Sequence, residues 1–359
     1  MARILFVAPF LSGGGAERVA SIWASGLAEL GGDIHLLLFY RVENEYEISG
    51  KVNLHTAAES KNAYDHFNGP EKLYCVRKLL KELKPDIVLP FISYVGILIM
   101  LAGAGLPIRI VETVRIDPKY DRPGPAWRLL RSLALGLSKR CIVQTQSQLN
   151  YFPRRLQKRM IVLPNPISDG FAKHKKIFTE KKIRNLVAVG RLEKQKNYPM
   201  LLKAFARVAA ADPELRLRIY GEGSLFDELD AMIGRLGLGE QVRLCGRTAG
   251  LEAALLEADL YVMASDAEGM PNSLMEAMAL GLPCISTDCQ TGPSDLIEHG
   301  TTGLLVPAGD EESFLEALEK MIKDVESSIE MGRKARETIL SRYGAAASAS
   351  KLLNYLASV

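Results

Sequence analysis

Short apolar runs alternate with longer stretches of helical hydrophobic spacing along the whole chain. In the first half, the runs that predict buried strands are residues 4–8, 34–39, 87–90, 108–111 and 141–144. In the second half they are residues 186–190, 217–220, 242–245, 260–264, 284–287 and 304–306. A regular alternation of strand and helix is typical of doubly wound α/β units with parallel sheets. The pattern therefore predicts two such units in succession.

The pattern changes between residues 165 and 186, where we expect the boundary between the two units. Asn165 and Pro166 close the first half, and residues 173–184 are polar and basic without apolar periodicity. A chain of 359 residues is long enough for two cores. We expect an N-terminal domain over residues 1–167, a linker over 168–185, a C-terminal domain over 186–340 and a terminal segment, 341–359, that forms a helix near 345–357.

Composition narrows the class of protein. The chain is 48% hydrophobic and 24% charged, as in ordinary globular proteins. Its five cysteines are odd in number and show no CxxC spacing, which favours free thiols in a reducing compartment. The first ten residues enter a strand pattern at once, and the longest apolar run, 95–107, is too short to span a bilayer. We therefore expect a cytoplasmic protein without a signal peptide.

Charge is distributed unevenly between the two halves. Residues 1–167 hold 22 Lys and Arg against 14 Asp and Glu, whereas the remainder holds 23 against 28. Opposite signs argue against a nucleic-acid-binding protein; they suit one domain that faces an anionic membrane or acceptor and another that holds a donor. Two stretches, 72–84 and 127–140, mix basic residues with leucines and suggest contact with a membrane surface. Packing of ordinary surface helices onto a sheet is the alternative.

The most informative stretch contains two glutamates, Glu268 and Glu276, separated by seven residues. It follows the apolar run 260–264 and leads into an expected helix that Gly281 stops. The N-terminus of a helix attracts anions, whereas an ionised glutamate only accepts hydrogen bonds and so favours hydroxyl groups. A nucleotide sugar carries both phosphates and hydroxyls, and therefore suits such a site.

Three further segments, 12–18, 190–197 and 281–297, occur in a matching order around this pair. Together the segments resemble retaining glycosyltransferase family 4, whose E-x7-E motif corresponds to Glu268 and Glu276. The resemblance covers nearly the whole chain. It implies the GT-B fold: two doubly wound Rossmann-like domains with a donor cleft between them, and a final helix that crosses back to the first domain.

The resemblance also implies roles for individual residues. In the family, positions matching Arg191 and Lys196 act on the donor diphosphate, Glu268 contacts the transferred sugar and Glu276 binds the ribose. The expected catalytic residues are Arg191, Lys196 and Glu268. The expected donor-binding residues are Gly13, Gly14, Gly15, Gly190, Arg191, Lys196, Gly221, Gly269, Met270, Asn272, Ser273, Leu274 and Glu276. No Asp-x-Asp pair is present, so we expect no metal and no cofactor beyond the donor.

On the acceptor side the chain departs from many relatives. Residues 111–118 contain neither the histidine nor the Glu-Arg-Asn-Asp-Pro run that those relatives carry, and none of the five histidines has a recognisable catalytic context. The acceptor-side candidates are Arg18, Glu112, Arg115 and Asp117. Gly292 and Pro293 resemble a motif of members that act on N-acetylhexosamines.

Several other functions fit the sequence less well. A dinucleotide-binding loop would need a third glycine where Arg18 stands. A glycosidase that used the two glutamates as acid and nucleophile would leave Arg191 and Lys196 without a function. A sugar-nucleotide epimerase and a non-catalytic sugar-binding protein remain as alternatives. We expect a retaining transferase that moves a hexose or N-acetylhexosamine from a nucleotide diphosphate sugar, UDP-linked, to a glycan or lipid-linked glycan.

Overall fold

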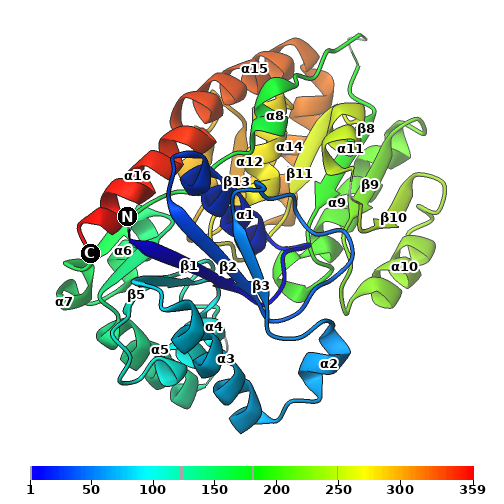
Figure 1. The fold of residues 1–359 in the computed structure, drawn as a ribbon. Coiled ribbons are helices and arrows are strands. Elements are labelled where there is room, and N and C mark those ends of the chain that lie inside the picture. Colours follow the sequence, from blue (N-terminus) through cyan, green and yellow to red (C-terminus); the bar gives the residue numbers. More distant parts are fainter. Residues whose placement is uncertain (1, 122–123, 180–181, 249) are drawn as a thin grey trace. The chain divides into compact units, whose positions relative to one another are not determined.

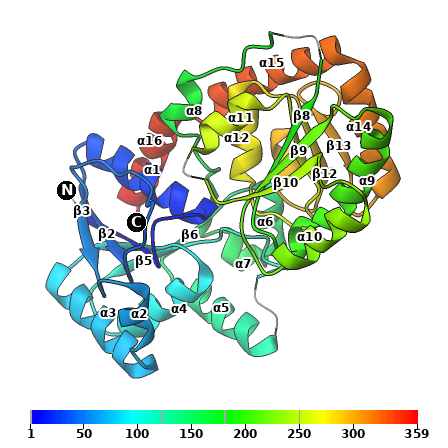
Figure 2. The same cartoon turned by 90° about the vertical axis from the view of Figure 1, so that its right-hand side faces the viewer.

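The computed structural model describes residues 2–121, 124–179, 182–248 and 250–359. The chain forms two compact units. Unit 1 comprises Met1–Pro166 together with Ala345–Val359, and unit 2 comprises Ile167–Gly344. Each unit is built on its own parallel sheet, of seven strands in unit 1 and six in unit 2 (Figures 1 and 2). This confirms the predicted α/β class with two doubly wound units.

The sheet of unit 1 has the strand order β3-β2-β1-β4-β5-β6-β7, and every pairing is parallel. Its strands are β1 (Arg3–Ala8), β2 (Asp33–Leu38), β3 (Asn53–Thr56), β4 (Ile87–Pro90), β5 (Arg109–Thr113), β6 (Arg140–Val143) and β7 (Met160–Val162). Its helices are α1 (Gly15–Glu29), α2 (Lys61–Asp65), α3 (Gly69–Leu83), α4 (Ser93–Ala102), α5 (Pro125–Leu137), α6 (Gln146–Tyr151), α7 (Arg154–Gln157) and α16 (Ala345–Ala357). The order of connection reverses between β1 and β4, which makes this the topological switch point of the sheet.

Two strands of unit 1, β3 and β7, are absent from the predicted set. Both lie at an edge of the sheet, and they contain only four and three residues. Their side chains are mostly half-buried or exposed, so they lack the continuous apolar run that identifies a central parallel strand.

Helix α16 packs on α1 although more than 300 residues separate them in sequence (Figure 1). The fully buried Trp23 of α1 donates a hydrogen bond from Nε1 to Ser348 Oγ at 2.9 Å. A Cβ added to Gly26 would lie 2.8 Å from Ala349 Cβ, so the two helices approach closely at this glycine. Leu352 and Leu356 complete the same apolar core.

The sheet of unit 2 has the order β10-β9-β8-β11-β12-β13, and its switch point lies between β8 and β11. Its strands are β8 (Asn185–Val189), β9 (Arg216–Tyr220), β10 (Val242–Gly246), β11 (Leu260–Met263), β12 (Cys284–Asp288) and β13 (Leu304–Pro307). Its helices are α8 (Asp169–Lys173), the 3-10 turn η1 (Lys194–Lys196), α9 (Tyr198–Ala211), α10 (Phe226–Arg235), α11 (Leu251–Glu257), α12 (Asn272–Leu280), α13 (Pro293–Leu296), α14 (Glu311–Lys323) and α15 (Val325–Arg342). Helices α9 and α14 cover one face, and α12 and α15 the other (Figure 2).

The observed units differ from the expected boundaries at the segment 168–185. Its described residues pack on unit 2 instead of forming a separate linker. Phe171 enters the core of unit 2, and Lys176 Nζ lies 3.3 Å from Asp259 Oδ1. Asp259 Oδ2 in turn accepts a hydrogen bond from the backbone N–H of Asn185 at 2.9 Å. Polar anchoring of this kind leaves no apolar periodicity in the sequence.

Within the described part of the chain, no helix has both the length and the apolar character needed to cross a bilayer.

One buried carboxyl group interrupts the apolar side of unit 1 beneath α4. Glu112, in β5, is only 4% exposed and lies against Gly96, where an added Cβ would be 2.3 Å from its Oε2 atom. Its Oε1 atom has no hydrogen-bond partner among the described residues. Burial raises the pKa of Glu112 to about 8, because the ionised form has lost its solvation.

This shift predicts that unit 1 loses stability as the pH rises. In the unfolded chain Glu112 ionises above about pH 4.5, whereas in the folded protein it keeps its proton until about pH 8. The free energy of unfolding should therefore fall between these values. Glu112→Gln cannot ionise, so its free energy of unfolding should not fall in this way. Between pH 5 and pH 8 we expect the stability of the variant to rise relative to that of the wild type by on the order of 1–3 kcal/mol, measured by urea unfolding. The exposed Glu82→Gln is the matched control; parallel pH curves for all three proteins would contradict the prediction.

Candidate active site

Helix α12 and the loop before it carry the two glutamates of the predicted motif. Glu268 lies in the loop that follows β11, and Glu276 lies within α12; they are 9% and 3% exposed. The helix ends at Gly281, which adopts φ +86°, and this confirms the predicted stop signal. The first intrahelical bond runs from Met275 N to Pro271 O at 3.1 Å, so the preceding N–H groups at this helix start have no intrahelical acceptor.

Lys196 and Glu268 form an ion pair at the switch point of unit 2. Lys196, in the turn after β8, places Nζ 2.5 Å from Glu268 Oε1, and both side chains are about 10% exposed. Ser265 Oγ donates a second hydrogen bond to the same Oε1 at 2.7 Å. Ser265 is absent from the predicted site residues, because a serine after a buried strand carries no distinctive signal.

The turn that carries Lys196 is tied to the loop that carries Glu268 at two further points. Asn197 Nδ2 donates to Asp266 Oδ1 at 3.0 Å, and Asp266 N donates to Gln195 O at 2.8 Å. On the other side of the pair, Thr291 Oγ1 donates to the carbonyl oxygen of Glu268. The segments that follow β8, β11 and β12 therefore hold one another in a defined arrangement.

Two glycines allow the backbone to close around this site. Gly221 follows β9 with φ +152°, and a Cβ there would lie 1.9 Å from Gly190 O. A Cβ on Gly190 would lie 2.8 Å from Cε of Lys196. A side chain at either position would push apart the ends of β8 and β9 or displace the lysine.

The other donor-side candidates occupy the same edge of the sheet with different exposures. Arg191 is exposed, and its side chain makes no hydrogen bond to the described residues. Ser273 Oγ donates to Val189 O at 3.2 Å and lies 2.8 Å from the hydroxyl of the buried Tyr261. Met270 and Leu274 are buried, and Asn272 is half-buried. Gly269 contacts the next loop, since a Cβ on Gly292 would lie 2.7 Å from Gly269 O.

The glycine-rich loop of unit 1 differs from a simple phosphate cradle. Gly13 adopts φ +69°, and Gly14 is the N-cap of α1, which begins at Gly15. The carboxyl group of the buried Glu17 lies over this N-terminus, because a Cβ on Gly14 would be 1.9 Å from its Oε2 atom. Arg18 places its guanidinium 4.7 Å from the ring centre of Tyr46. A carboxylate at this helix start competes with a phosphate for the same N–H groups.

The remaining acceptor-side candidates, Glu112, Arg115 and Asp117, lie in β5 or just after it. Their environments differ. Glu112 faces α4, whereas the guanidinium of Arg115 stacks on Trp23. Asp117 is 2% exposed and accepts a hydrogen bond from Lys119 N at 2.9 Å. The three residues are thus close in sequence, but their side chains have different surroundings and do not bond to one another.

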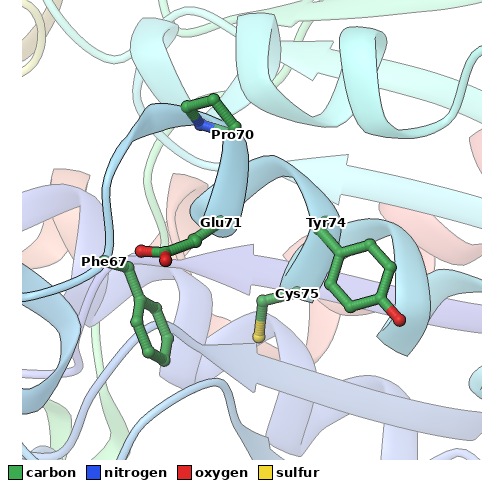
Figure 3. A pocket seen from close by; sticks show the side chains of 5 residues that line it. All are labelled: Phe67, Pro70, Glu71, Tyr74 and Cys75. Carbon is green, nitrogen blue, oxygen red and sulfur yellow. The ribbon is translucent and has the colours of Figure 1, made fainter.

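A separate hollow of about 470 Å³ lies on the surface of unit 1 (Figure 3). It is lined by Phe67, Pro70, Glu71, Tyr74 and Cys75, all in or just before α3. None of the predicted site residues lines this hollow. Among the described residues, no group of three His, Cys, Asp or Glu side chains is arranged to hold a metal ion.

Two family models match the chain, one on each unit. "Glycosyltransferase Family 4" matches residues 13–170, and "Glycosyl transferases group 1" matches residues 169–338. The chain is also similar to the GalNAc-alpha-(1->4)-GalNAc-alpha-(1->3)-diNAcBac-PP-undecaprenol alpha-1,4-N-acetyl-D-galactosaminyltransferase of Campylobacter jejuni. The two are 28% identical over 342 residues, which cover 94% of this chain and 93% of that protein.

Solved structures share the fold over the full length. The complex of Anabaena HepE with UDP and glucose has a TM-score of 0.82 at 18% identity and covers 100% of both chains. Sucrose-phosphate synthase from Thermosynechococcus elongatus has a TM-score of 0.85 at 16% identity and covers 100% of this chain and 99% of that one. The two sheets, the two family matches and the full-length relative lead to one conclusion: the chain is a glycosyltransferase of the GT-B fold, in the family 4-like group.

Proposed function

We propose that the protein transfers an N-acetylhexosamine or hexose from a UDP-linked donor to a lipid-linked glycan, with retention of configuration. The observation that carries the proposal is the Lys196–Glu268 pair at the switch point of unit 2. In this proposal the lysine binds a diphosphate and the glutamate accepts hydrogen bonds from sugar hydroxyls, close to the start of α12. Ligands of open α/β sheets bind outside the carboxyl ends of the strands at this point.

In this proposal the donor is held by three kinds of contact. Arg191, Lys196 and the N–H groups of Ser273 and Leu274 bind the diphosphate, because all of them direct positive charge toward it. Glu276 accepts hydrogen bonds from the ribose, and Glu268 accepts them from the transferred sugar. In the free protein Lys196 neutralises Glu268, so an anionic donor does not meet an uncompensated carboxylate. Gly190 and Gly221, which have no side chain, let the backbone of unit 2 approach the donor closely.

The proposed chemical step needs no covalent enzyme intermediate. The bond between the anomeric carbon and the diphosphate oxygen breaks, and the electron pair leaves with the diphosphate. The acceptor oxygen forms its bond to the same face of that carbon and passes its proton to the departing phosphate. Lys196 and Arg191 stabilise the charge that develops on the leaving group. No metal takes part in this proposal, and an unchanged rate in EDTA is its direct test.

The relatives support the choice of donor and acceptor. The Campylobacter protein is named for adding N-acetylgalactosamine in α-linkage to an undecaprenol-diphosphate-linked glycan, and the Anabaena structure contains UDP and glucose. Nucleotide hexosamines are α-glycosides, so an α-linked product corresponds to retention. Gly292 and Pro293 resemble a motif of family members that act on N-acetylhexosamines, which favours such a donor.

Lys196→Ala and Arg191→Ala should each lower kcat by about 10²–10³ while the fold stays intact, since each removes a preorganised partner of developing charge. Transfer from UDP-N-acetylglucosamine, UDP-N-acetylgalactosamine and UDP-glucose is followed by UDP release, and folding by thermal unfolding. Lys194→Ala, in the same turn and exposed, is the matched control. Near-normal turnover of both variants would refute the diphosphate assignment.

Calorimetry should distinguish the proposed roles of the two glutamates. Glu276→Ala should weaken binding of UDP itself by about tenfold or more, because its proposed partners are ribose hydroxyls. Glu268→Ala should leave UDP affinity within about threefold and impair the intact donor more strongly. Equal losses for both ligands in both variants would remove this division of labour.

Membrane contact is the second part of the proposal, and the structure distinguishes the two basic stretches. In α3, Val76 and Leu80 are buried, and Arg77 donates to the carbonyl oxygens of Ala102 and Ala104, so this helix packs as an ordinary surface helix.

Helix α5 has the opposite arrangement: it buries a cation and exposes leucines. Arg131 is 7% exposed and donates to Pro118 O at 2.7 Å and to Asp121 Oδ2 at 3.2 Å. Leu129, Leu130, Leu133 and Leu137 are between 41% and 72% exposed. The exposed Arg128 and Lys139 accompany them. An apolar face with basic residues suits insertion into an anionic cytoplasmic leaflet.

The wild-type protein should therefore sediment with vesicles of phosphatidylglycerol, and salt should weaken this binding because charge attraction is screened. Replacement of Leu129, Leu133 and Leu137 with Gln should abolish sedimentation while UDP binding persists. Tyr74→Gln changes another exposed apolar side chain, on α3, and should have no effect. Equal vesicle binding by the triple variant would show that α5 is not the contact.

A further inference from the structure

Arg115 follows β5, one strand away from the topological switch point of unit 1 between β1 and β4. Its guanidinium lies 4.3 Å from the ring centre of Trp23 and 4.9 Å from that of Phe91. Trp23 belongs to α1, which follows β1, and Phe91 directly follows β4. The cation therefore lies between elements from both sides of the point where the strand order reverses. This is the place where open α/β sheets bind ligands.

One side of the guanidinium is fixed by hydrogen bonding. Arg115 Nη1 donates to Asn165 Oδ1 at 3.0 Å, and the same oxygen accepts a hydrogen bond from Gln144 Nε2 at 2.7 Å. Asn165 and Gln144 follow β7 and β6, so the ends of three strands hold this side chain in place. Arg115 thus has a defined orientation instead of a mobile one.

The other side of the guanidinium has no partner. Nε and Nη2 are both buried and make no hydrogen bond within the described part of the chain. These two nitrogens form the edge of the fork that binds two oxygens of one oxyanion side by side. No carboxylate among the described residues pairs with Arg115, and burial lowers the pKa of its guanidinium to about 9. A buried cation without a counter-charge is costly, and a bound anion would offset that cost.

We propose that the Nε and Nη2 edge of Arg115 binds a phosphate group of the acceptor. The inference rests on the proposed function, in which the acceptor is a lipid-linked glycan and therefore carries phosphate. The start of α1 is a weaker candidate for this phosphate, because Glu17 places a carboxyl group over it.

Tryptophan fluorescence reads this site directly. The chain has two tryptophans, Trp23 and Trp127, so Trp127→Phe leaves emission only from the indole on which Arg115 stacks. Titration of this variant with inorganic pyrophosphate should give a saturable change in emission. Adding Arg115→Gln should raise the apparent Kd by about tenfold or more, and Arg115→Lys should restore part of it, since Lys keeps the charge without the fork. Adding Lys196→Ala, in unit 2, should leave the Trp23 response unchanged.

Titrations with farnesyl diphosphate, a lipid diphosphate, and with sodium glucuronate, a carboxylate, test which anion the site binds. Tighter binding of farnesyl diphosphate than of pyrophosphate assigns the phosphate to a lipid-linked acceptor, and equal binding assigns it to a soluble one. A response to glucuronate but not to pyrophosphate would overturn the choice of phosphate. No saturable response, or the same response in the Arg115→Gln protein, would overturn the site.

Calorimetry with UDP on the same proteins separates the two proposals. Normal UDP binding by the Arg115→Gln protein shows that it is folded, and an absent Trp23 response in the parent protein then rejects this inference alone. An Arg115-dependent response in a protein that binds no UDP would preserve the anion site and reject the proposed function.

Discussion

The Lys196–Glu268 ion pair is the interaction on which the arrangement of unit 2 around its candidate site depends. Desolvation of two charges often cancels their attraction, so such a pair contributes geometry more reliably than stability. Here the pair is supported by Ser265 and by the contact between Asn197 and Asp266. These contacts join the segments that leave β8 and β11, and they fix the distance between a cation and a carboxylate before any ligand binds. Preorganisation of this kind lowers the cost of binding a charged donor.

Unit 1 has a charge close to the switch point of its sheet but holds it differently. Arg115 is supported by the faces of two aromatic rings and by one amide oxygen, with no carboxylate among the described residues. Aromatic faces attract a cation without neutralising it. The guanidinium therefore keeps its full charge for another partner, whereas the charge of Lys196 is already balanced by Glu268. The two units thus present different electrostatic conditions to ligands.

The sequence predicts the central strands and the end of α12 because their signals are local. Buried parallel strands read as apolar runs, and Gly281 ends a helix through its own backbone conformation. The edge strands β3 and β7 are not predicted, because they are short and partly exposed. The position of Ser265 and the stacking of Arg115 on Trp23 depend on contacts between distant segments, which no local pattern encodes. Likewise, spacing alone could not show that α5 buries Arg131 while its leucines face outward.

The packing of α16 against α1 makes unit 1 discontinuous along the chain. During synthesis, residues 2–166 leave the ribosome long before Leu352 and Leu356 exist to cover their side of the core. The buried face of Trp23 and its neighbours must therefore wait, exposed to solvent or to chaperones, while all of unit 2 is translated and can fold. Unit 2, which is continuous, is the part able to fold first, and residues 345–359 then complete unit 1.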